Sequence, residues 1–587
     1  MLALILSAVI VAPSPKLINI VWDGAPDWVI DRMLKEGKLP NVARLAATGF
    51  RAETCIPAWP SKTAVGHASI FTASWPDQHG VSNNTVGLLP RYEHSLSESM
   101  RGFDGRALQN EPIWVTAARQ GKKVVTLSAA CSFPPDPFVA QLKQVKKERN
   151  WVGFSGFEQE WAQGKMINEP GEVEVAGSTF SVRLHDDPTD PKQGPDSVII
   201  QRGDEIDILK PKPAGDTKAW SHQFEIRKAG STANVYFRLF SLKDGRLELY
   251  QRKLSPIYGT ESDEAVNKYV RAYGGFHDDA FGLYERGTFG NTIFQGGEGE
   301  AEKRILEIVE QDCEFLKRGF DYGWKAWKPD ILFHYTPMSD SAGHTWMGAL
   351  DPAIPGYDPA IAARIWPYYE RVFELQDGWL GHMMDHCGKN TVVALMSDHG
   401  MAGARQYVHV NNALEAAGLL KRTSSGAIDW TVSQAAVPSW SDFFVTVNGT
   451  DRKGGIVSAA DRESVLERAE QALLRIVDPQ TDKPIITSVF RADRLSYLGI
   501  GGQAGGDLYF EMAPGYYPSN RANRSTTSPY GSEIGGGVHG FFPYRREMGA
   551  IFYASGPGVE HRSNLAIRHV DIMPLLCRAI GITAPNR

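Results

Sequence analysis

The sequence predicts an α/β fold in which a mostly parallel sheet is flanked by helices and interrupted by a β-rich insertion. Short apolar runs rich in β-branched residues alternate with stretches of helical period over most of the chain, a pattern typical of parallel strands joined by helices. From about residue 171 to 254, apolar and polar residues instead alternate with a period of two, as in half-exposed strands. The 587 residues exceed what one simple core supports, roughly 250 to 300 residues, so we expect more than one structural unit.

The α/β pattern begins with the run LINIVW over residues 17–22, which predicts a strand. A loop and a helical stretch over about 27–47 follow it. Three further strands are predicted where KVVTLS, DILFHY and TVVALMS stand, at residues 123–128, 330–335 and 391–397. This alternation implies a sheet covered by helices on both faces.

The β-rich insertion contains segments such as EVEVAGSTFSVRL and ANVYFRLFSLKDGRLELYQRKL, the latter with Asp244-Gly245 as a hairpin turn. Helices predicted over residues 300–319 and about 360–387 then return the chain to the α/β pattern. We therefore expect one core from residues 16–150 and 300–587, an insertion over about 160–260, and a connecting segment over 261–299.

The first twelve residues, MLALILSAVIVA, form an apolar run that Pro13 and Pro15 then break. Spanning a bilayer takes about 20 apolar residues, so no transmembrane span is expected there. The position of the run favours a signal-peptide core over residues 1–12 and hence an exported protein, periplasmic or secreted. Because the usual preceding basic residues are missing, a buried first strand is the alternative.

Composition excludes several classes of protein. Hydrophobic residues make up 42% and charged residues 22%, which is typical of a globular enzyme and not of a disordered, fibrous or multi-span membrane protein. A net charge of -6 without a basic block predicts no nucleic-acid binding beyond nucleotide-type substrates. The five cysteines stand singly, which predicts neither a zinc ribbon nor a disulfide framework.

Three predicted strands are each followed by a carboxylate, where the loops of an open α/β sheet carry its ligands. Asp23 follows the first strand, Asp340 follows ILFHYTPMS, and Asp398-His399 follow VVALMS. His344 stands four residues after Asp340, so one turn of helix or a tight loop puts both side chains on the same side. Two of the three strand ends thus combine carboxylate with imidazole.

A further isolated histidine, His539, stands in the glycine-rich EIGGGVHGFF, where small neighbours allow close approach to a buried ion. Carboxylate oxygens and imidazole nitrogens together are ligands that zinc accepts. Any one of these side chains alone is more often structural, because a strand-end Asp commonly caps a helix or turns a loop. Their joint occurrence favours a metal site.

The stretch WPSKTAVGHASIFTASWPDQHGVSNN resembles the nucleophile segment of the nucleotide pyrophosphatases/phosphodiesterases of the alkaline phosphatase superfamily. Its motif runs from Pro60 to Thr63, and a His79-Gly80 turn leads to Asn84. The other family blocks follow in order as DSAGH, SDHG, GVHGFF before MGAIFYASGPG, and the closing VDIMPLLCRAIGITAPNR. The resemblance covers the chain apart from the insertion and much of residues 402–506, and it implies an alkaline phosphatase-like core.

The resemblance implies two divalent metal ions per chain, zinc with manganese as the alternative. It assigns Thr63 as the nucleophile and Asn84 as a donor to a non-bridging phosphoryl oxygen. One ion is expected on Asp340, His344 and His539. The second is expected on Asp23, Asp398, His399 and the Thr63 oxygen.

The chemistry of these residues agrees with that assignment. A threonine hydroxyl is a weak nucleophile, and coordination to a dication activates it without a separate base. Because Thr63 begins the helical stretch TAVGHASIFTA, backbone N–H groups and the positive end of the helix dipole are expected to face the phosphoryl oxygens. The expected course is a phosphothreonine intermediate on a small phosphorylated substrate.

Several residues resemble functional groups without fitting a site. Cys55 opens CIPAW, which is similar to the Cys-x-Pro-x-Arg of sulfatases, but Trp59 replaces the arginine. His382 and His386 have the spacing of helical zinc ligands without the HExxH pattern. We interpret these residues as structural. His67 and His79 flank the nucleophile segment and are interpreted as structural or supporting groups. His334 stands within a predicted strand and is interpreted as structural.

The reaction within the superfamily depends on the charge available for the substrate. Threonine-using monoesterases carry a Lys-x-Arg pair after the strand that follows the nucleophile helix, whereas this chain reads VVTLSAACSFPPDP over residues 124–137. That difference favours a diester or phosphoanhydride, whose reacting phosphoryl group carries less charge. The alternatives are a phosphonoacetate hydrolase-like C–P hydrolase, a phosphomonoesterase, and a non-catalytic exported binding protein. The oligomeric state and the role of the insertion stay open.

Overall fold

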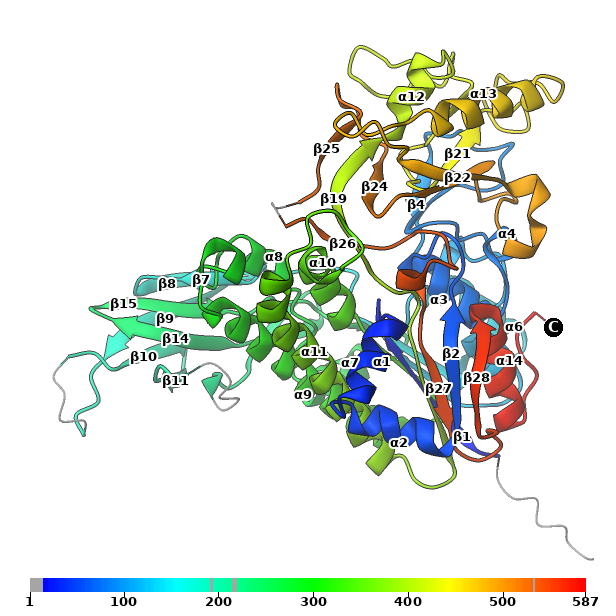
Figure 1. Ribbon diagram of the computed structural model, residues 1–587. Helices are drawn as coiled ribbons and strands as arrows, with labels where there is room; N and C mark the ends of the chain where they lie inside the picture. Colours follow the sequence, from blue (N-terminus) through cyan, green and yellow to red (C-terminus); the bar gives the residue numbers. More distant parts are fainter. Residues whose placement is uncertain (1–13, 190–193, 214–218, 532–533, 587) are drawn as a thin grey trace, which may run out of the picture.

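The computed structural model describes residues 14–189, 194–213, 219–531 and 534–586 (Figure 1), and it confirms the predicted α/β fold class. The predicted signal peptide over residues 1–12 lies outside the described residues. A central sheet has nine strands. Their order is β16 (Tyr258–Gly259), β6 (Trp151–Ser155), β5 (Val124–Leu127), β17 (Ile331–Thr336), β1 (Lys16–Trp22), β18 (Thr391–Met396), β27 (Phe552–Ser555), β2 (Phe50–Ile56) and β28 (Arg562–Arg568).

The middle of this sheet is parallel, as predicted. β6, β5, β17, β1 and β18 all run in the same direction. β16 and β27 pair antiparallel with their neighbours. Because β17, β1 and β18 are adjacent and parallel, the residues that follow them meet at one edge of the sheet.

Both faces of the sheet are buried under helices. Alternate residues of β1 enter two separate hydrophobic clusters, Ile18 and Ile20 on one face and Leu17 and Val21 on the other, as the period of a strand requires. The first cluster includes residues of α9 (Glu300–Trp327), α10 (Met338–Leu350) and α11 (Pro359–His386), and the second includes residues of α3 (Thr63–Thr72), α5 (Ile113–Arg119) and α14 (His569–Ile580).

The prediction of a single helix over residues 27–47 is wrong, although the region is helical. The chain forms two helices there, α1 (Asp27–Lys35) and α2 (Pro40–Thr48). Gly37 between them has a φ of +72°, and Pro40 stands at the first position of α2, where its missing N–H costs no helical hydrogen bond. The apolar residues keep a helical period across Gly37 and Pro40, so the period alone did not reveal that the chain breaks there.

Antiparallel strands occupy the region expected to be β-rich, which projects to the left in Figure 1. A four-stranded sheet of β11-β10-β9-β8 and a β14-β15-β7 sheet share a hydrophobic cluster. Asp244 and Gly245 both have positive φ at the β14/β15 turn, as two-residue hairpins favour. These strands are β7 (Lys165–Ile167), β8 (Gly171–Val175), β9 (Ser178–His185), β10 (Ser197–Arg202), β11 (Glu205–Leu209), β14 (Phe237–Lys243) and β15 (Arg246–Gln251). The predicted domain boundaries stay a prediction.

The segment that begins with β19 (Ala402–His409), contains β25 (Thr527–Pro529) and ends with β26 forms a further unit at the top of Figure 1. The family motifs left much of its residues 402–506 uncovered. It has its own hydrophobic cluster, and its two sheets are β20-β21-β23-β22 and β24-β19-β25, with β26 paired to β19. Its elements include α12 (Val410–Ala416), α13 (Arg462–Leu474), β20 (Ala435–Ala436), β21 (Phe444–Val447), β22 (Ile486–Arg491), β23 (Leu508–Met512), β24 (Gly515–Ser519) and β26 (Gly536–Val538).

Among the described residues, no helix combines the length and the apolar character needed to cross a bilayer.

Candidate metal centre and adjoining cavity

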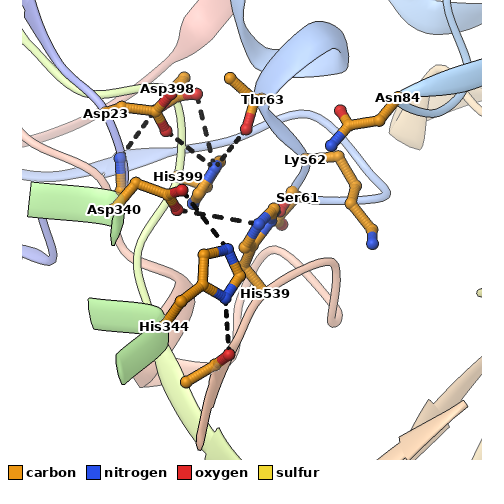
Figure 2. A network of polar contacts seen from close by, with 12 residues as sticks. Asp23, Ser61, Lys62, Thr63, Asn84, Asp340, His344, Asp398, His399 and His539 are labelled. Atoms are coloured by element: carbon orange, nitrogen blue, oxygen red, sulfur yellow. Dashed lines mark hydrogen bonds and ion pairs between the residues drawn. The ribbon is translucent and has the colours of Figure 1, made fainter. Parts of the chain in front are cut away.

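Six side chains predicted as metal ligands converge at the carboxyl edge of β1, β17 and β18 (Figure 2). Asp23 follows β1 and Asp398 follows β18. His399 Nε2 lies 3.3 Å from Asp23 Oδ1 and 3.5 Å from Asp398 Oδ2. Asp340 and His344 come from α10, and His344 Nε2 lies 3.4 Å from Asp340 Oδ2.

The sixth predicted ligand, His539, follows β26 and completes the cluster. Its ring stacks on that of His399, with centroids 3.7 Å apart, and its Nε2 lies 3.9 Å from Asp340 Oδ1. All six therefore lie within reach of one another although they come from four distant parts of the chain.

The three histidines of the cluster share one hydrogen-bonding arrangement. Nδ1 of His344 lies 2.7 Å from the Gly537 carbonyl, Nδ1 of His399 lies 2.8 Å from the Gly400 carbonyl, and Nδ1 of His539 lies 2.9 Å from the Ser61 carbonyl. A carbonyl oxygen only accepts, so each Nδ1 must carry the proton. In the neutral ring, each Nε2 then presents a lone pair to the carboxylates, as metal-binding histidines do.

One oxygen of each carboxylate in the cluster lacks a hydrogen-bond donor among the described residues. Oδ1 of Asp23, Oδ1 of Asp340 and Oδ2 of Asp398 are buried without a partner. Buried charges of this kind are normally paired or bound to a metal. Burial and the nearby Asp23 charge raise the pKa of Asp398 well above its ordinary value, because both disfavour the ionised carboxylate. The donor set fits a dication.

Two tight groups of potential ligand atoms can be distinguished within the cluster. Asp340, His399 and His539 form one, and Asp23, His67 and Asp398 form the other, with ligand atoms within 4.8 Å of one another in each. His399 thus stands between the two groups. His67 belongs to the second group because its Nε2 lies 3.5 Å from Asp398 Oδ2, and neither ring nitrogen has a hydrogen bond among the described residues.

Thr63 is the first residue of α3 and lies beside the carboxylates. Its Oγ1 is 3.1 Å from His399 Nε2, and its side chain is buried with the residue 6% exposed. Lys62 before it has extended backbone, and its Nζ lies 2.7 Å from Asp442 Oδ2 and 2.6 Å from the Tyr517 hydroxyl. The Lys62 side chain runs away from the carboxylates in Figure 2 and ties the start of α3 to the unit that contains β24.

Asn84 lies beside Thr63 and caps its helix. Asn84 Oδ1 accepts a hydrogen bond from the Ala64 backbone N–H at 3.0 Å, whereas Lys62 at the N-cap position provides no side-chain cap. The Ala64 N–H is therefore engaged by Asn84, and the expectation that backbone N–H groups at the start of the helix face phosphoryl oxygens stays a prediction for the others. The two donors of the Asn84 amide remain for another acceptor.

Two supporting residues were not recognised from the sequence. The Tyr335 hydroxyl donates to Asp23 Oδ2, and the Gly24 N–H donates to Asp398 Oδ1 at 3.0 Å. Gly24 has a φ of +61°, and a Cβ there would lie 2.8 Å from Asp340 Oδ1, so the turn after β1 requires glycine. Tyr335 stands near the end of an apolar strand, and the only sequence feature that could have indicated its role is its position shortly before Asp340.

A cavity of about 320 Å³ opens beside Thr63, Asn84 and Asp340. Besides the small side chains of residues 128–131, its lining outside the carboxylate cluster includes four aromatic rings, one arginine and two acidic residues. These residues are Arg101, Phe103, Asp104, Phe133, Phe157, Glu158 and Tyr335. Sequence analysis singled out none of them, because they come from separate parts of the chain and share no motif.

The residues interpreted as structural lie apart from the cluster, except for His67. His79 Nδ1 accepts from the Val81 N–H at 3.1 Å, so Nε2 donates to Ser69 Oγ at 2.9 Å. His334 is buried against Trp379, with ring centroids 4.8 Å apart. His382 lies 2.8 Å from Asp321, and Cys55 is buried in β2.

Comparison with protein families gives one match that covers most of the chain. Residues 17–163 and 189–542 match the family described as type I phosphodiesterase / nucleotide pyrophosphatase. The match includes every residue of the carboxylate and histidine cluster as well as Thr63 and Asn84.

Individual relatives match over shorter stretches. Human ectonucleotide pyrophosphatase/phosphodiesterase family member 1 is 36% identical over 88 residues, which are 15% of this chain and 9% of that protein. The Caenorhabditis elegans ectonucleotide pyrophosphatase/phosphodiesterase C27A7.1 is 32% identical over 113 residues, which are 19% of this chain and 13% of that protein.

One solved structure with a similar chain is murine ectonucleotide pyrophosphatase / phosphodiesterase 5, an inactive variant in complex with AMP. The two chains have a TM-score of 0.46 and 12% sequence identity over 97% of this chain and 96% of that one.

Proposed function

The chain belongs to the type I phosphodiesterase / nucleotide pyrophosphatase family, and we propose that it is a metal-dependent hydrolase of phosphodiester or phosphoanhydride bonds. The substrates would be small phosphorylated molecules, nucleotide-type ones among them. The reaction would pass through a phosphothreonine on Thr63. Family membership and the side chains around Thr63 both support this reading.

The observation that carries the proposal is the shared orientation of three histidines beside Thr63. Each donates a hydrogen bond from Nδ1–H to a backbone carbonyl, and the Nε2 of each ring faces the carboxylates. Structural histidines have no reason to share this arrangement around unpartnered carboxylate oxygens, whereas metal ligands need it.

We assign one ion to Asp340, His344 and His539 and a second to Asp23, Asp398, His399 and the Thr63 hydroxyl. Zinc is the proposed metal, with manganese as the alternative, because both accept oxygen and nitrogen ligands. His399 stands between the two groups of potential ligand atoms, and His67 lies close to Asp398. We infer that the positions of these two rings determine which ligands bind which ion. Bound there, the ions would offset the carboxylate charge and polarise both the threonine hydroxyl and the phosphoryl oxygens.

The protein's own residues would then perform a two-step displacement. Thr63 Oγ1 bonds to phosphorus as the bond to the leaving oxygen breaks, and water later cleaves the threonine ester and restores the hydroxyl. The Asn84 amide donates to a non-bridging oxygen, because its carbonyl is already engaged by the Ala64 N–H. Tyr335 and Gly24 hold Asp23 and Asp398 in place through their hydrogen bonds.

A substrate panel with metal analysis on the same preparation tests the proposal. The panel contains bis-p-nitrophenyl phosphate, p-nitrophenyl phosphate, a nucleotide p-nitrophenyl ester and phosphonoacetate. We expect diester hydrolysis that disappears on chelation and returns with zinc or manganese. Preferred release of phosphate from phosphonoacetate would instead favour a C–P hydrolase, and no turnover by the metal-loaded protein would support a binding protein.

A further inference from the structure

Arg101 brings an uncompensated positive charge to the cavity beside Thr63. It is the only arginine or lysine among the described residues that line this cavity. The guanidinium lies 6.0 Å from the centre of the Phe103 ring. Within the described part of the chain it has no ion pair and donates no hydrogen bond, and the residue is exposed.

The backbone of Arg101 is held in a fixed position relative to the nucleophile. Arg101 ends β4 (Ser99–Arg101), where it pairs with Thr85 of β3 (Thr85–Gly87). The next residue, Gly102, donates its N–H to the Asn84 carbonyl at 2.8 Å. Asn84 in turn caps the helix that Thr63 begins. Two hydrogen bonds therefore connect the Arg101 hairpin to the start of α3.

Gly102 allows this hairpin to sit directly on the nucleophile helix. A Cβ at Gly102 would lie 2.2 Å from the Asn83 carbonyl oxygen and 3.2 Å from the Ala64 Cβ. Any side chain there would push the hairpin away from the helix. The close approach fixes where the Arg101 side chain enters the cavity.

The other charged groups on the outer wall do not neutralise Arg101. Asp104 pairs with Arg106 at 2.5 Å. Glu158 accepts a hydrogen bond from Ser155 Oγ at 3.2 Å and is itself exposed. Asp23 and Asp340 belong to the proposed metal centre. An arginine fork that faces a cavity without a protein partner is suited to an anionic group on a ligand, which it binds through charge-assisted hydrogen bonds.

We propose that Arg101 is a specificity-determining residue that binds a second anionic group of the substrate. This inference rests on the proposed function. The second charge is either another unesterified oxygen on the reacting phosphorus or a separate phosphate or carboxylate elsewhere on the substrate. Residues 128–137, which directly follow β5, contain no Lys-x-Arg pair for such a charge, and Arg101 provides a cation from a different part of the chain.

Matched esters that differ by one charge test the proposal by kinetics. The first pair is p-nitrophenyl phosphate and methyl p-nitrophenyl phosphate, which carry the second charge on phosphorus or lack it. The second pair is p-nitrophenyl carboxyphenyl phosphate and p-nitrophenyl phenyl phosphate, which carry the charge on the outer group or lack it. Arg101→Gln, Arg101→Lys and the control Arg119→Gln, an exposed arginine paired with Glu111, are compared on all four.

We expect Arg101→Gln to lower kcat/KM by about 10- to 100-fold for the doubly charged member of one pair, the range of a lost charge-assisted hydrogen bond. The singly charged partner of that pair should change less than about threefold, and Arg101→Lys should recover part of the loss. The pair that responds identifies where the second charge lies. Equal losses within both pairs, or no loss in either, would overturn the inference while leaving the hydrolase proposal intact.

A binding measurement separates failure of this inference from failure of the proposed function. Phenylphosphonate and its monomethyl ester differ by one charge at pH 8 and contain no phosphoester bond to an aryl leaving group. Calorimetric titration of the metal-loaded wild type should show tighter binding of phenylphosphonate, and Arg101→Gln should weaken it about tenfold or more without affecting the monoester. If the protein hydrolyses no ester but shows this difference, only the proposed reaction fails. If it binds both compounds equally in wild type and variant, a second charge on phosphorus is rejected, and the role of Arg101 is rejected altogether when the carboxyphenyl pair also shows no difference.

Discussion

Asn84 accepts the backbone N–H of Ala64 through its side-chain oxygen at 3.0 Å, so the amide predicted to bind substrate is also the cap of the nucleophile helix. The side chain has one acceptor and two donors. Capping uses the acceptor, which orients the amide nitrogen independently of any ligand. The same residue therefore links the stability of α3 to the proposed catalytic role.

Two substitutions separate these functions of Asn84. Asn84→Ala removes both, and we expect a loss of about 1 kcal/mol in unfolding free energy together with a fall in kcat/KM of about 10- to 100-fold. Asn84→Asp keeps the acceptor for Ala64 but loses the donors, so stability should stay within about 0.5 kcal/mol of wild type while activity falls at least as far. Urea unfolding and diester kinetics measure the two effects. An active Asn84→Asp protein would contradict the donor role.

Thr63→Ala should abolish turnover because no other hydroxyl takes the place of Oγ1 beside His399. We expect a fall in kcat of at least about 1,000-fold with near-wild-type metal content, since the proposed ligands other than Oγ1 remain. Thr63→Ser, which keeps the hydroxyl, is the matched control and should retain measurable activity. Diester hydrolysis and metal analysis on the same samples provide the readout, and an active alanine variant would refute the nucleophile assignment.

Tyr335→Phe removes the hydroxyl that donates to Asp23 while keeping the aromatic wall of the cavity. Hydrogen bonds to metal ligands orient them, and losing one typically costs about 10- to 100-fold in metal affinity or activity. We expect weaker zinc binding in a chelator competition, with part of the lost activity restored at higher zinc concentration. Phe333→Leu, buried on the same face of β17 two residues before Tyr335, controls for disturbance of that strand. Unchanged zinc affinity in Tyr335→Phe would show that Asp23 needs no such support.

Metal binding should become stronger as the pH rises. Burial alone lowers the pKa of His399, but the charges of Asp398 and Asp23 outweigh it and raise the pKa to about 10. The metal-free protein therefore holds a proton on His399 at neutral pH, and a metal ion must displace it to reach Nε2. We expect the logarithm of zinc affinity to rise by about one per pH unit between about pH 6.5 and 8.5, with release of a proton in weakly buffered solution. An affinity that does not change over this range would contradict the expectation.

His79 should make stability depend on pH in the acid range. Burial lowers the pKa of its imidazole to about 3, against an ordinary value of 6.5, so the unfolded chain binds a proton that the folded one does not. The contribution of neutral His79 is complete above pH 6.5 and is lost as the pH falls toward 3. We expect His79→Asn, which keeps an acceptor for the Val81 N–H, to reduce the slope of unfolding free energy by about 1.4 kcal/mol per pH unit in that window. The same substitution at exposed His386 should leave the slope unchanged.

Much of the candidate site could be predicted from the sequence because its residues stand directly after strands. The apolar runs before Asp23 and Asp398 identify buried parallel strands, and parallel strands bring their carboxyl ends to the same edge. The four-residue spacing of Asp340 and His344 fits the helix α10 in which both lie. These relationships are local, so a single sequence contains them.

The contacts that complete the site depend on segments far apart in the chain, and local patterns do not encode them. The Asp442 carboxylate holds Lys62, Tyr335 donates to Asp23, and Arg101 enters the cavity through a hairpin seated on Ala64. His67 reads as a structural histidine within an apolar helix, yet α3 directs it to Asp398. The sequence by itself determined the parallel strands and the candidate ligands at their ends, because periodicity and strand ends are local properties. Only tertiary structure decided which side chains orient those candidate ligands and line the cavity beside Thr63, because this depends on how distant segments pack together.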